Sequence, residues 1–229
     1  MTEKAKIVVV NGENYWQEFF PDFDVVQIKI QHSQWILKNQ KLYVIFDNQI
    51  IEPAGILWRV GAIRPTAIQQ TALCMIALSN VPCINSATSL LKGFDRLSML
   101  SELKSCDLPT VNYNIISHSS LSKNLTQEFP FVIKAGNYHG GFGKVLVKDS
   151  ANWQDIQDLL FTNEDYIVAE PYIDYVRDIR YLLIGDKAWA MARKGKFWKA
   201  NVQTTDFALI DLDKTLLAKF KKITDSNQC

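Results

Sequence analysis

Residues 129–148 read FPFVIKAGNYHGGFGKVLVK, two apolar stretches joined by a loop that contains four glycines. Glycine allows positive φ and lets backbone approach a ligand closely. A series of exposed backbone N–H groups in such a loop can hold phosphate oxygens. Lys134 and Lys144 add positive charge at the two ends of the loop. This stretch predicts a β-hairpin whose glycine-rich tip folds over phosphate groups.

The two standard phosphate-binding loops do not fit this stretch. A Walker A loop ending at Lys144 would need glycine at Tyr138 and Ser or Thr at Val145. The dinucleotide pattern would need glycine at Leu146. Both loops also precede a helix, whereas an apolar strand pattern follows here. A long hairpin with a flexible tip, and no ligand, is the alternative that the loop alone leaves open.

Length, composition and charge describe an ordinary globular chain of 229 residues with a net charge of +1. This charge argues against a dominant nucleic-acid surface. The apolar run at residues 7–10 is too short for a signal sequence or a membrane span, so we expect a cytoplasmic protein without a membrane partner. The four cysteines lack a C-x-x-C spacing, which indicates neither a disulfide framework nor a zinc site.

Apolar periodicity indicates an α/β protein with three parts. Alternating strands and helices predict a parallel N-terminal α/β domain over residues 1–86. A connecting helix and the glycine hairpin follow over 87–165, and a smaller antiparallel sheet over 166–229. The expected strands are 7–10, 25–30, 42–46, 55–60, 81–84, 109–116, 166–170, 178–184, 187–193 and 195–201. The expected helical segments are 66–79, 86–104, 151–161 and 212–223.

A second candidate feature follows from the Gly185-Asp186 turn, because a two-residue loop fixes the register of its strands. This register places Asp178 opposite Arg193, with Arg180 on the same face. Lys199 and Asn201 share one face of the next expected strand. Such a cationic face suits phosphate or carboxylate binding. A solvated face with ordinary ion pairs is the alternative, and the glycine loop favours a nucleotide site.

Taken in order, these motifs resemble the ATP-grasp family, in particular the RimK-type amino-acid ligases and synapsin. The segment 129–144 resembles the family's lid hairpin, and 168–173, VAEPYI, resembles its adenine-binding hinge. The motifs 178–180, 191–193 and 198–201 then follow in the family's order. The resemblance implies an N-terminal domain that precedes the ATP-grasp unit, a lid subdomain, and an incomplete C-terminal antiparallel sheet.

The resemblance also implies roles for individual residues. Arg180 and Arg193 would be the catalytic residues, which bind the transferred phosphoryl group or the acyl phosphate. Glu170, Tyr172 and Ile173 would hold the adenine, and Asp178 would bind the ribose hydroxyls. The residues expected near the phosphates are Arg96, Lys134, Gly140, Gly141, Gly143, Lys144, Lys199 and Asn201.

In this family, ATP phosphorylates a substrate carboxylate and an amine displaces the phosphate. The resemblance therefore implies ATP and Mg²⁺ as cofactors, and a small carboxylate or a peptide as substrate. The family's metal ligands, an aspartate and then a Glu-x-Asn pair, have no counterpart after Asn201, where the chain offers Asp206, Asp211 and Asp213. The metal ligands are thus unknown.

Three explanations of this departure stay open: a truncated chain, a second polypeptide or homodimer that completes the site, and a nucleotide-binding module without catalysis. The function hypotheses are accordingly an ATP-dependent carboxylate–amine ligase, a synapsin-like non-catalytic nucleotide binder, and an α/β protein that binds no nucleotide.

Overall fold

The computed structural model describes residues 4–59, 65–163, 166–199 and 202–226. The chain divides into two compact units, Met1–Glu102 with Thr224–Cys229, and Leu103–Ile223. We describe each unit by itself. The three-part division at residues 86 and 165 stays a prediction.

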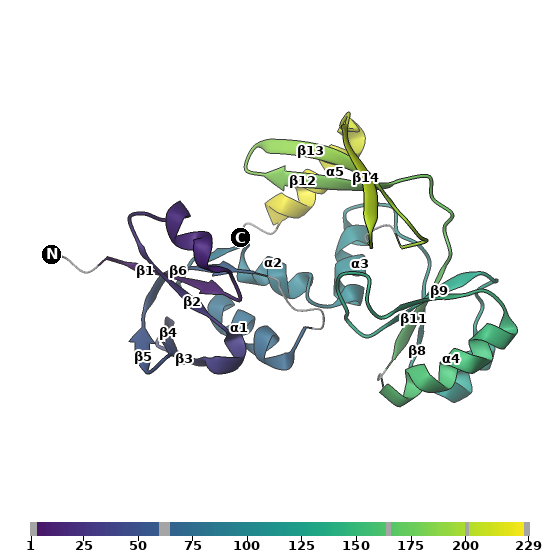
Figure 1. The fold of residues 1–229 in the computed structure, drawn as a ribbon, viewed down its shortest axis with the longest axis horizontal. Coiled ribbons are helices and arrows are strands. Elements are labelled where there is room, and N and C mark those ends of the chain that lie inside the picture. The colour runs from purple at the N-terminus through teal and green to yellow at the C-terminus, as the bar shows by residue number, and fades with distance from the viewer. Residues whose placement is uncertain (1–3, 60–64, 164–165, 200–201, 227–229) are drawn as a thin grey trace. The chain divides into compact units, whose positions relative to one another are not determined.

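A parallel four-stranded sheet forms the centre of the first unit (Figure 1). Its order is β2-β1-β6-β7, and its strands are β1 (Lys6–Val10), β2 (Asp24–Ile28), β6 (Pro53–Trp58) and β7 (Cys83–Ile84). Strand β1 pairs on both sides, which explains why Val8, Val9 and Val10 are fully buried. The 3₁₀ segments η1 (Asn14–Phe19) and η2 (Ile30–His32) follow β1 and β2. The predicted parallel α/β layer is therefore present.

Three helices of the first unit begin at side chains that cap them. Helix α1 (Ala67–Ala77) starts at a capping box formed by Thr66 and Gln69. Helix α2 (Ala87–Lys92) is capped by Ser86, which accepts from the N–H of Ser89. Helix α3 (Arg96–Ser105) follows Asp95, whose carboxylate accepts from two backbone N–H groups. Capping of this kind satisfies donors that lack an intrahelical partner.

An antiparallel sheet of three strands also belongs to the first unit: β3 (Gln34–Lys38), β4 (Lys41–Phe46) and β5 (Gln49–Ile51). The sequence patterns indicated only β4. Leu42, Val44 and Ile51 of this sheet join the same hydrophobic core as Val8 and Val10.

The second unit contains the glycine hairpin. Its first sheet has the order β10-β9-β11-β8, with β8 (Asn114–Ile116), β9 (Phe131–Ala135), β10 (Lys144–Val147) and β11 (Ile167–Pro171). Helix α4 (Ser150–Asn163) and the 3₁₀ segment η3 (Ser119–Asn124) lie beside this sheet (Figure 1). Phe131 and Ile133 of β9 pack with Trp153 of α4 in its core.

A second, three-stranded sheet completes this unit: β12 (Asp178–Ile184), β13 (Lys187–Gly195) and β14 (Thr204–Ile210), followed by α5 (Lys214–Ser226). The predicted strand at 195–201 is wrong over residues 196–199; Gly195 ends β13, and residues 200–201 lie outside the described residues. Residues 196–199 form a turn region, and the third strand begins at Thr204. Within the described chain, no helix combines the length and apolar character needed to cross a bilayer.

Candidate functional site

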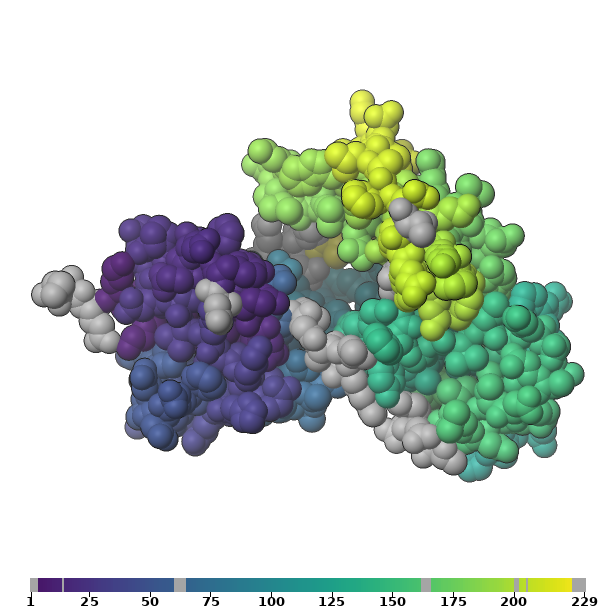
Figure 2. Space-filling model, in the orientation of Figure 1, coloured from purple at the N-terminus to yellow at the C-terminus, as the bar shows by residue number. Residues whose placement is uncertain are grey.

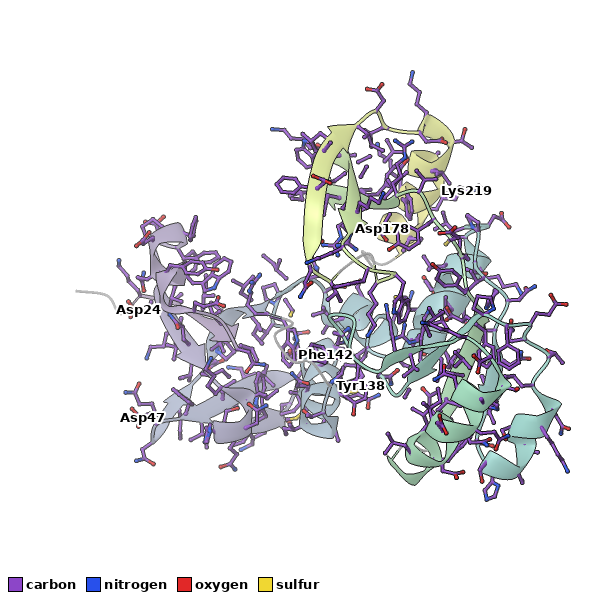
Figure 3. All side chains as sticks on the ribbon, turned by 45° about the vertical axis from the view of Figure 1, so that its right-hand side comes forward. Asp24, Asp47, Tyr138, Phe142, Asp178 and Lys219 are labelled. Carbon is purple, nitrogen blue, oxygen red and sulfur yellow. The ribbon has the colours of Figure 1, made fainter. Side chains whose placement is uncertain are left out.

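The glycine loop joins β9 to β10, as the sequence predicts. The two strands pair antiparallel with Lys134 opposite Lys144. Gly140, Gly141 and Gly143 have φ of 68°, 88° and 64°, which non-glycine residues adopt at a cost. The N–H of Ala135 donates to the carbonyl oxygen of Gly143 at 2.7 Å and closes the base of the loop. Tyr138 and Phe142 of this loop are labelled in Figure 3.

Alternation along the strands gives the lid sheet an apolar face and a charged face. Phe131, Ile133 and Ala169 point to the core under α4. Val132, Lys134 and Glu170 share the opposite face, because Glu170 pairs with Val132 in the register. Both neighbouring strands thus place their charged side chains on the side away from the core.

Lys134 and Glu170 form an ion pair on this charged face. Glu170 is 5% exposed, and the pair occupies only its Oε2 atom. The other carboxylate oxygen, Oε1, is buried and has no hydrogen-bond partner among the described residues. An unsatisfied buried acceptor is costly, so this oxygen marks a place where a donor from a ligand would be favourable.

A second ion pair lies at the start of the β12–β13 hairpin. Asp178 and Arg193 are directly opposite in the register, which confirms the prediction, and Arg193 Nε donates to Asp178 Oδ1 at 2.5 Å. Tyr175 lies beside this pair. Burial raises the pKa of the Tyr175 phenol, and the Asp178 carboxylate adds to the rise. The Tyr175 hydroxyl stays protonated and donates to the carbonyl oxygen of Trp198 at 3.1 Å.

Lys199 connects the two sheets of the second unit. Its Nζ atom donates to the carbonyl oxygen of Gly141 at 3.1 Å and lies 5.2 Å from the ring centroid of Trp198. The sequence predicts Lys199 on a strand face, and this placement is wrong because residues 196–199 are in a turn. Asn201, predicted beside it, lies outside the described residues.

These groups surround a pocket of about 310 Å³. Eight of the predicted site residues line it: Lys134, Lys144, Glu170, Tyr172, Ile173, Asp178, Arg193 and Lys199. Gly140 and Gly143 belong to the adjoining loop but do not line the pocket. Arg180 lies on the same sheet face as Asp178, two residues further along β12. Arg96 begins α3 in the first unit, so its role stays a prediction.

Five residues that also line the pocket were not predicted as site residues: Val111, Val132, Pro171, Tyr175 and Trp198. Val132 could have been found, since it is two residues from Lys134 and shares its face. Trp198 begins the motif 198–201, but no local pattern pairs it with Tyr175, because the hydrogen bond that joins them spans 23 residues of sequence.

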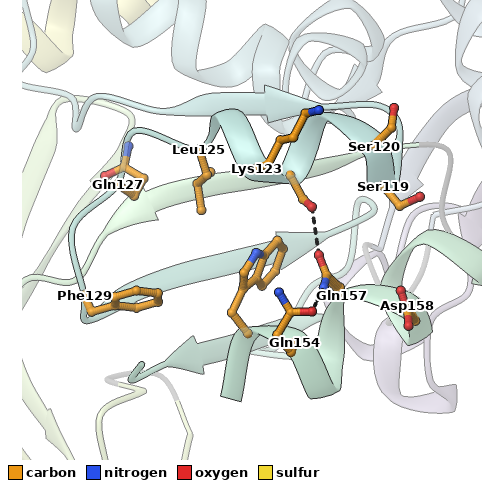
Figure 4. Close-up of a pocket in the computed structure, with 11 residues that line it drawn as sticks. Ser119, Ser120, Lys123, Leu125, Gln127, Phe129, Gln154, Gln157 and Asp158 are labelled. Carbon is orange, nitrogen blue, oxygen red and sulfur yellow. Dashed lines mark hydrogen bonds between the residues drawn. The ribbon is translucent and has the colours of Figure 1, made fainter. Parts of the chain in front are cut away.

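A larger cavity of about 590 Å³ lies between η3 and α4 (Figure 4). Three of its polar side chains are linked by hydrogen bonds: Ser122 donates to Gln157 at 2.8 Å, and Gln157 donates to Gln154 at 2.7 Å. Lys123 and Asp158 are the charged residues that line it. The smaller pocket, with four cationic side chains and an unpaired buried acceptor, is the better candidate for an anionic ligand.

The pocket suits an adenine nucleotide by its donor and acceptor set. Glu170 Oε1 is an acceptor for an exocyclic amino group. The N–H of Tyr172 already donates to the carbonyl oxygen of Pro130 at 3.4 Å, whereas the N–H of Ile173 makes no hydrogen bond to the described chain.

A Cβ at Gly143 would lie 2.6 Å from the Ala135 carbonyl oxygen, so the loop packs too closely there for a side chain. Among the described residues, no cluster of three or more His, Cys, Asp or Glu side chains could hold a metal.

Comparison with known families places the chain among nucleotide-binding folds. The model of the synapsin ATP-binding domain matches residues 97–225, more than half of the chain. The chain belongs to the synapsin ATP-binding domain family. Its match includes the glycine hairpin, the hinge at Glu170 and all three strands of the β12-β13-β14 sheet.

Solved structures show that this synapsin-family chain has the ATP-grasp fold. A RimK-domain ATP-grasp protein from Sphaerobacter thermophilus superposes with a TM-score of 0.68 at 15% identity, over 97% of this chain and 82% of that one. D-alanyl-alanine synthetase A from Vibrio cholerae gives 0.65 at 10% identity, over 98% and 80%. N5-carboxyaminoimidazole synthetase from Staphylococcus aureus, complexed with ADP, gives 0.65 at 14% identity, over 99% and 64%. The predicted resemblance and α/β fold class are confirmed.

Proposed function

We propose that this chain binds ATP in the pocket between its lid sheet and the β12–β13 hairpin, and that it is an ATP-dependent carboxylate–amine ligase. The observation that carries the proposal is the convergence of Lys134, Lys144, Arg193 and Lys199 on one pocket beside an unpaired buried oxygen of Glu170. Membership of the synapsin ATP-binding family supports it, and so does the likeness in fold to the ATP-grasp ligase PsnB and to a D-alanine–D-alanine ligase.

Each side chain has a physical task in this proposal. Glu170 Oε1 accepts from the adenine amino group, and the Ile173 N–H donates to the ring. Lys134 and Lys144 bind phosphate oxygens from the base of the glycine loop. Arg193 holds Asp178 through one carboxylate oxygen, which leaves the other for a ribose hydroxyl. Preorganised charges of this kind stabilise phosphoryl transfer without reorganisation during the reaction.

Bound ATP would supply the phosphoryl group that converts a substrate carboxylate to an acyl phosphate, from which an amine releases phosphate as the C–N bond forms. Arg180 and Arg193 are the proposed contacts to the transferred group, and Mg²⁺ is the proposed counterion, with ligands that the described residues do not identify. The fold of the neighbour PsnB has been solved with Mg and ADP, which agrees with this set of cofactors.

The test has a binding arm and a turnover arm. Calorimetry with ATP and Mg²⁺ should give saturable binding that Lys134→Ala weakens about 10- to 100-fold, since a charge-assisted hydrogen bond contributes roughly 1.5–3 kcal/mol. Lys148→Ala is the matched control, because Lys148 is an exposed lysine at the end of the same hairpin. A melting curve of each variant separates loss of binding from loss of fold.

The turnover arm measures ADP release with a panel of carboxylic acids and amines. Release that requires both an acid and an amine supports the ligase. Binding without turnover across the panel would assign the chain to non-catalytic nucleotide binders. No heat of binding and an unchanged melting temperature at millimolar ATP would contradict both functions, because a bound ligand stabilises the fold by mass action.

A further inference from the structure

The β12-β13-β14 sheet has one face covered by α5 and one face that α5 leaves uncovered. Tyr181 of β12 packs its ring against Phe220 of α5, with centroids 4.8 Å apart. The Tyr181 hydroxyl also accepts from the N–H of Asp213 at 3.2 Å. Residues adjacent to Tyr181 along the strand point to the opposite side. The face of Arg180 and Leu182 is therefore the one away from α5.

The register of the three strands defines the composition of this face. Arg180 is opposite Met191, which is opposite Leu209, and Leu182 is opposite Trp189. We call these five residues the open face. Leu209 is 71% exposed and Leu182 is 40% exposed, while Trp189 and Met191 are partly buried. The chain around β14, yellow in Figure 2, lies at the molecular surface in that view.

Contiguous exposed apolar side chains are uncommon on soluble proteins unless they bind something. Phe207 of β14 and Ile184 of β12 extend the same face and are 75% and 69% exposed. Cross-strand neighbours lie about 5 Å apart, so the side chains of one row touch. The open face thus offers a continuous apolar platform wide enough for an aromatic or branched aliphatic group.

One charge distinguishes the open face from a purely apolar patch. Arg193 is occupied by Asp178. Arg180 is exposed and has no ion pair with the described residues. A free guanidinium bordered by Met191 and Leu182 matches a carboxylate attached to an apolar group.

The open face is also continuous with the nucleotide pocket. Asp178 and Arg193 form the next row on the same sheet face, and both line that pocket. Rows on one face are about 7 Å apart along a strand. A carboxylate held by Arg180 would therefore lie one row from the proposed phosphate site.

We propose that the open face binds the acid substrate, with the carboxylate against Arg180 and an apolar or aromatic body over Leu182, Trp189, Met191 and Leu209. The proposal rests on the ligase function and assigns its substrate class as acids with an apolar body. A second copy of the chain fits this face less well. Arg180, and Lys187 at the far end of the same sheet face, have no ion pair with the described residues, so two copies would bring like charges together.

The experiment measures binding of three probes by calorimetry, each with and without a non-hydrolysable ATP analogue. The probes are 4-phenylbutyrate, acetate, and the uncharged 4-phenylbutyramide. We expect 4-phenylbutyrate to bind at least tenfold more tightly than either of the others. Equal affinity for 4-phenylbutyrate and acetate, or no binding of any acid while the ATP analogue still binds, would overturn the inference and leave the nucleotide proposal standing. If the ATP analogue does not bind to the unmodified protein, that result would instead refute the proposed function.

Paired variants locate the site. Arg180→Gln should weaken 4-phenylbutyrate at least tenfold, whereas Lys187→Gln, at the far end of the same face, should leave it within twofold. Leu209→Asn should weaken the phenyl acid and leave the affinity for acetate unchanged, and Ala208→Asn, its neighbour on the opposite face, should change neither. Equal effects within each pair would contradict the proposal. A concentration-dependent dimer that Leu209→Asn dissociates would assign the face to self-association and would also overturn it.

Discussion

The glycine loop offers a sharp test, because Gly143 is constrained in two ways. Its φ of 64° costs about 1–2 kcal/mol for alanine. A Cβ would also lie 2.6 Å from the Ala135 carbonyl oxygen and 2.7 Å from the Tyr138 ring. Relieving these contacts moves the backbone that accepts the 2.7 Å hydrogen bond from Ala135, at a cost of about 1 kcal/mol. Gly143→Ala should therefore destabilise the second unit by about 3 kcal/mol.

Gly185→Ala is the matched control, because Gly185 has a similar φ of 55° and its Cβ would meet nothing within 4 Å. We expect it to cost about 1 kcal/mol, from the backbone alone. Melting temperatures should fall by roughly 6–12 °C for Gly143→Ala and by 2–4 °C for Gly185→Ala. If the loop of Gly143→Ala opens locally instead, the affinity for ATP falls while the melting temperature changes less. Equal melting temperatures together with equal ATP affinities for the two variants would refute the steric reasoning.

Three further predictions concern single contacts. Lys199→Met removes the hydrogen bond to the Gly141 carbonyl oxygen, so hydrogen exchange of the loop amides, measured by mass spectrometry, should accelerate. Unchanged exchange would show that this hydrogen bond does not hold the loop. Asp178→Asn leaves Arg193 without its carboxylate partner and should destabilise the chain by about 1 kcal/mol in urea unfolding, a small value because Asp178 is partly exposed. Burial raises the pKa of Cys83 from 9.0 to about 12, so at pH 8 its thiolate fraction is about 10⁻⁴. Because the thiolate is the reactive form, Ellman's reagent should modify the exposed Cys74 far faster than Cys83, as peptide mapping would show. Equal labelling of Cys74 and Cys83 would contradict the raised pKa. The same pKa shift of Cys83 contributes folding stability that is present below pH 9 and lost as the pH rises from 9 to 12.

The parts of the site that local chemistry determines could be predicted from the sequence. Two residues, Gly185 and Asp186, join β12 to β13, and a loop of that length leaves one register. That register fixes Asp178 opposite Arg193 before any tertiary contact is known. The glycine hairpin was predictable for a similar reason, since its apolar strands and positive-φ glycines are adjacent in sequence.

The parts that the sequence did not reveal depend on distant contacts. Phe197 and Trp198 suggest a strand by propensity, yet their segment is a turn. Hydrogen bonds to residues 23 and 58 positions away, Tyr175 and Gly141, hold that turn. The Lys134–Glu170 pair likewise joins strands whose adjacency no local pattern indicates. Strand propensity is a weak guide where tertiary contacts of this kind compete with it.

Strands β3 and β5 were missed although a local signal exists. Asn39 and Gln40, and then Asp47 and Asn48, have positive φ and form two-residue turns at the ends of β4. Asn and Asp tolerate this conformation better than other side chains. Such a pair at each end of an apolar run favours hairpins on both sides, which is the arrangement observed.

The charge balance of the pocket favours the Mg²⁺ complex of ATP over free ATP. Among the described lining residues, Lys134, Lys144, Arg193 and Lys199 face two carboxylates, a net charge of +2. Both carboxylates are already paired with cations, so they are poor ligands for a divalent ion. Free ATP carries about four negative charges at neutral pH and would leave about two of them uncompensated in this cleft, whereas its Mg²⁺ complex carries about two, which the cleft compensates. The complex therefore matches the pocket, and the metal would be held mainly by the phosphates. ATP affinity should accordingly rise when Mg²⁺ is added to an EDTA-treated protein.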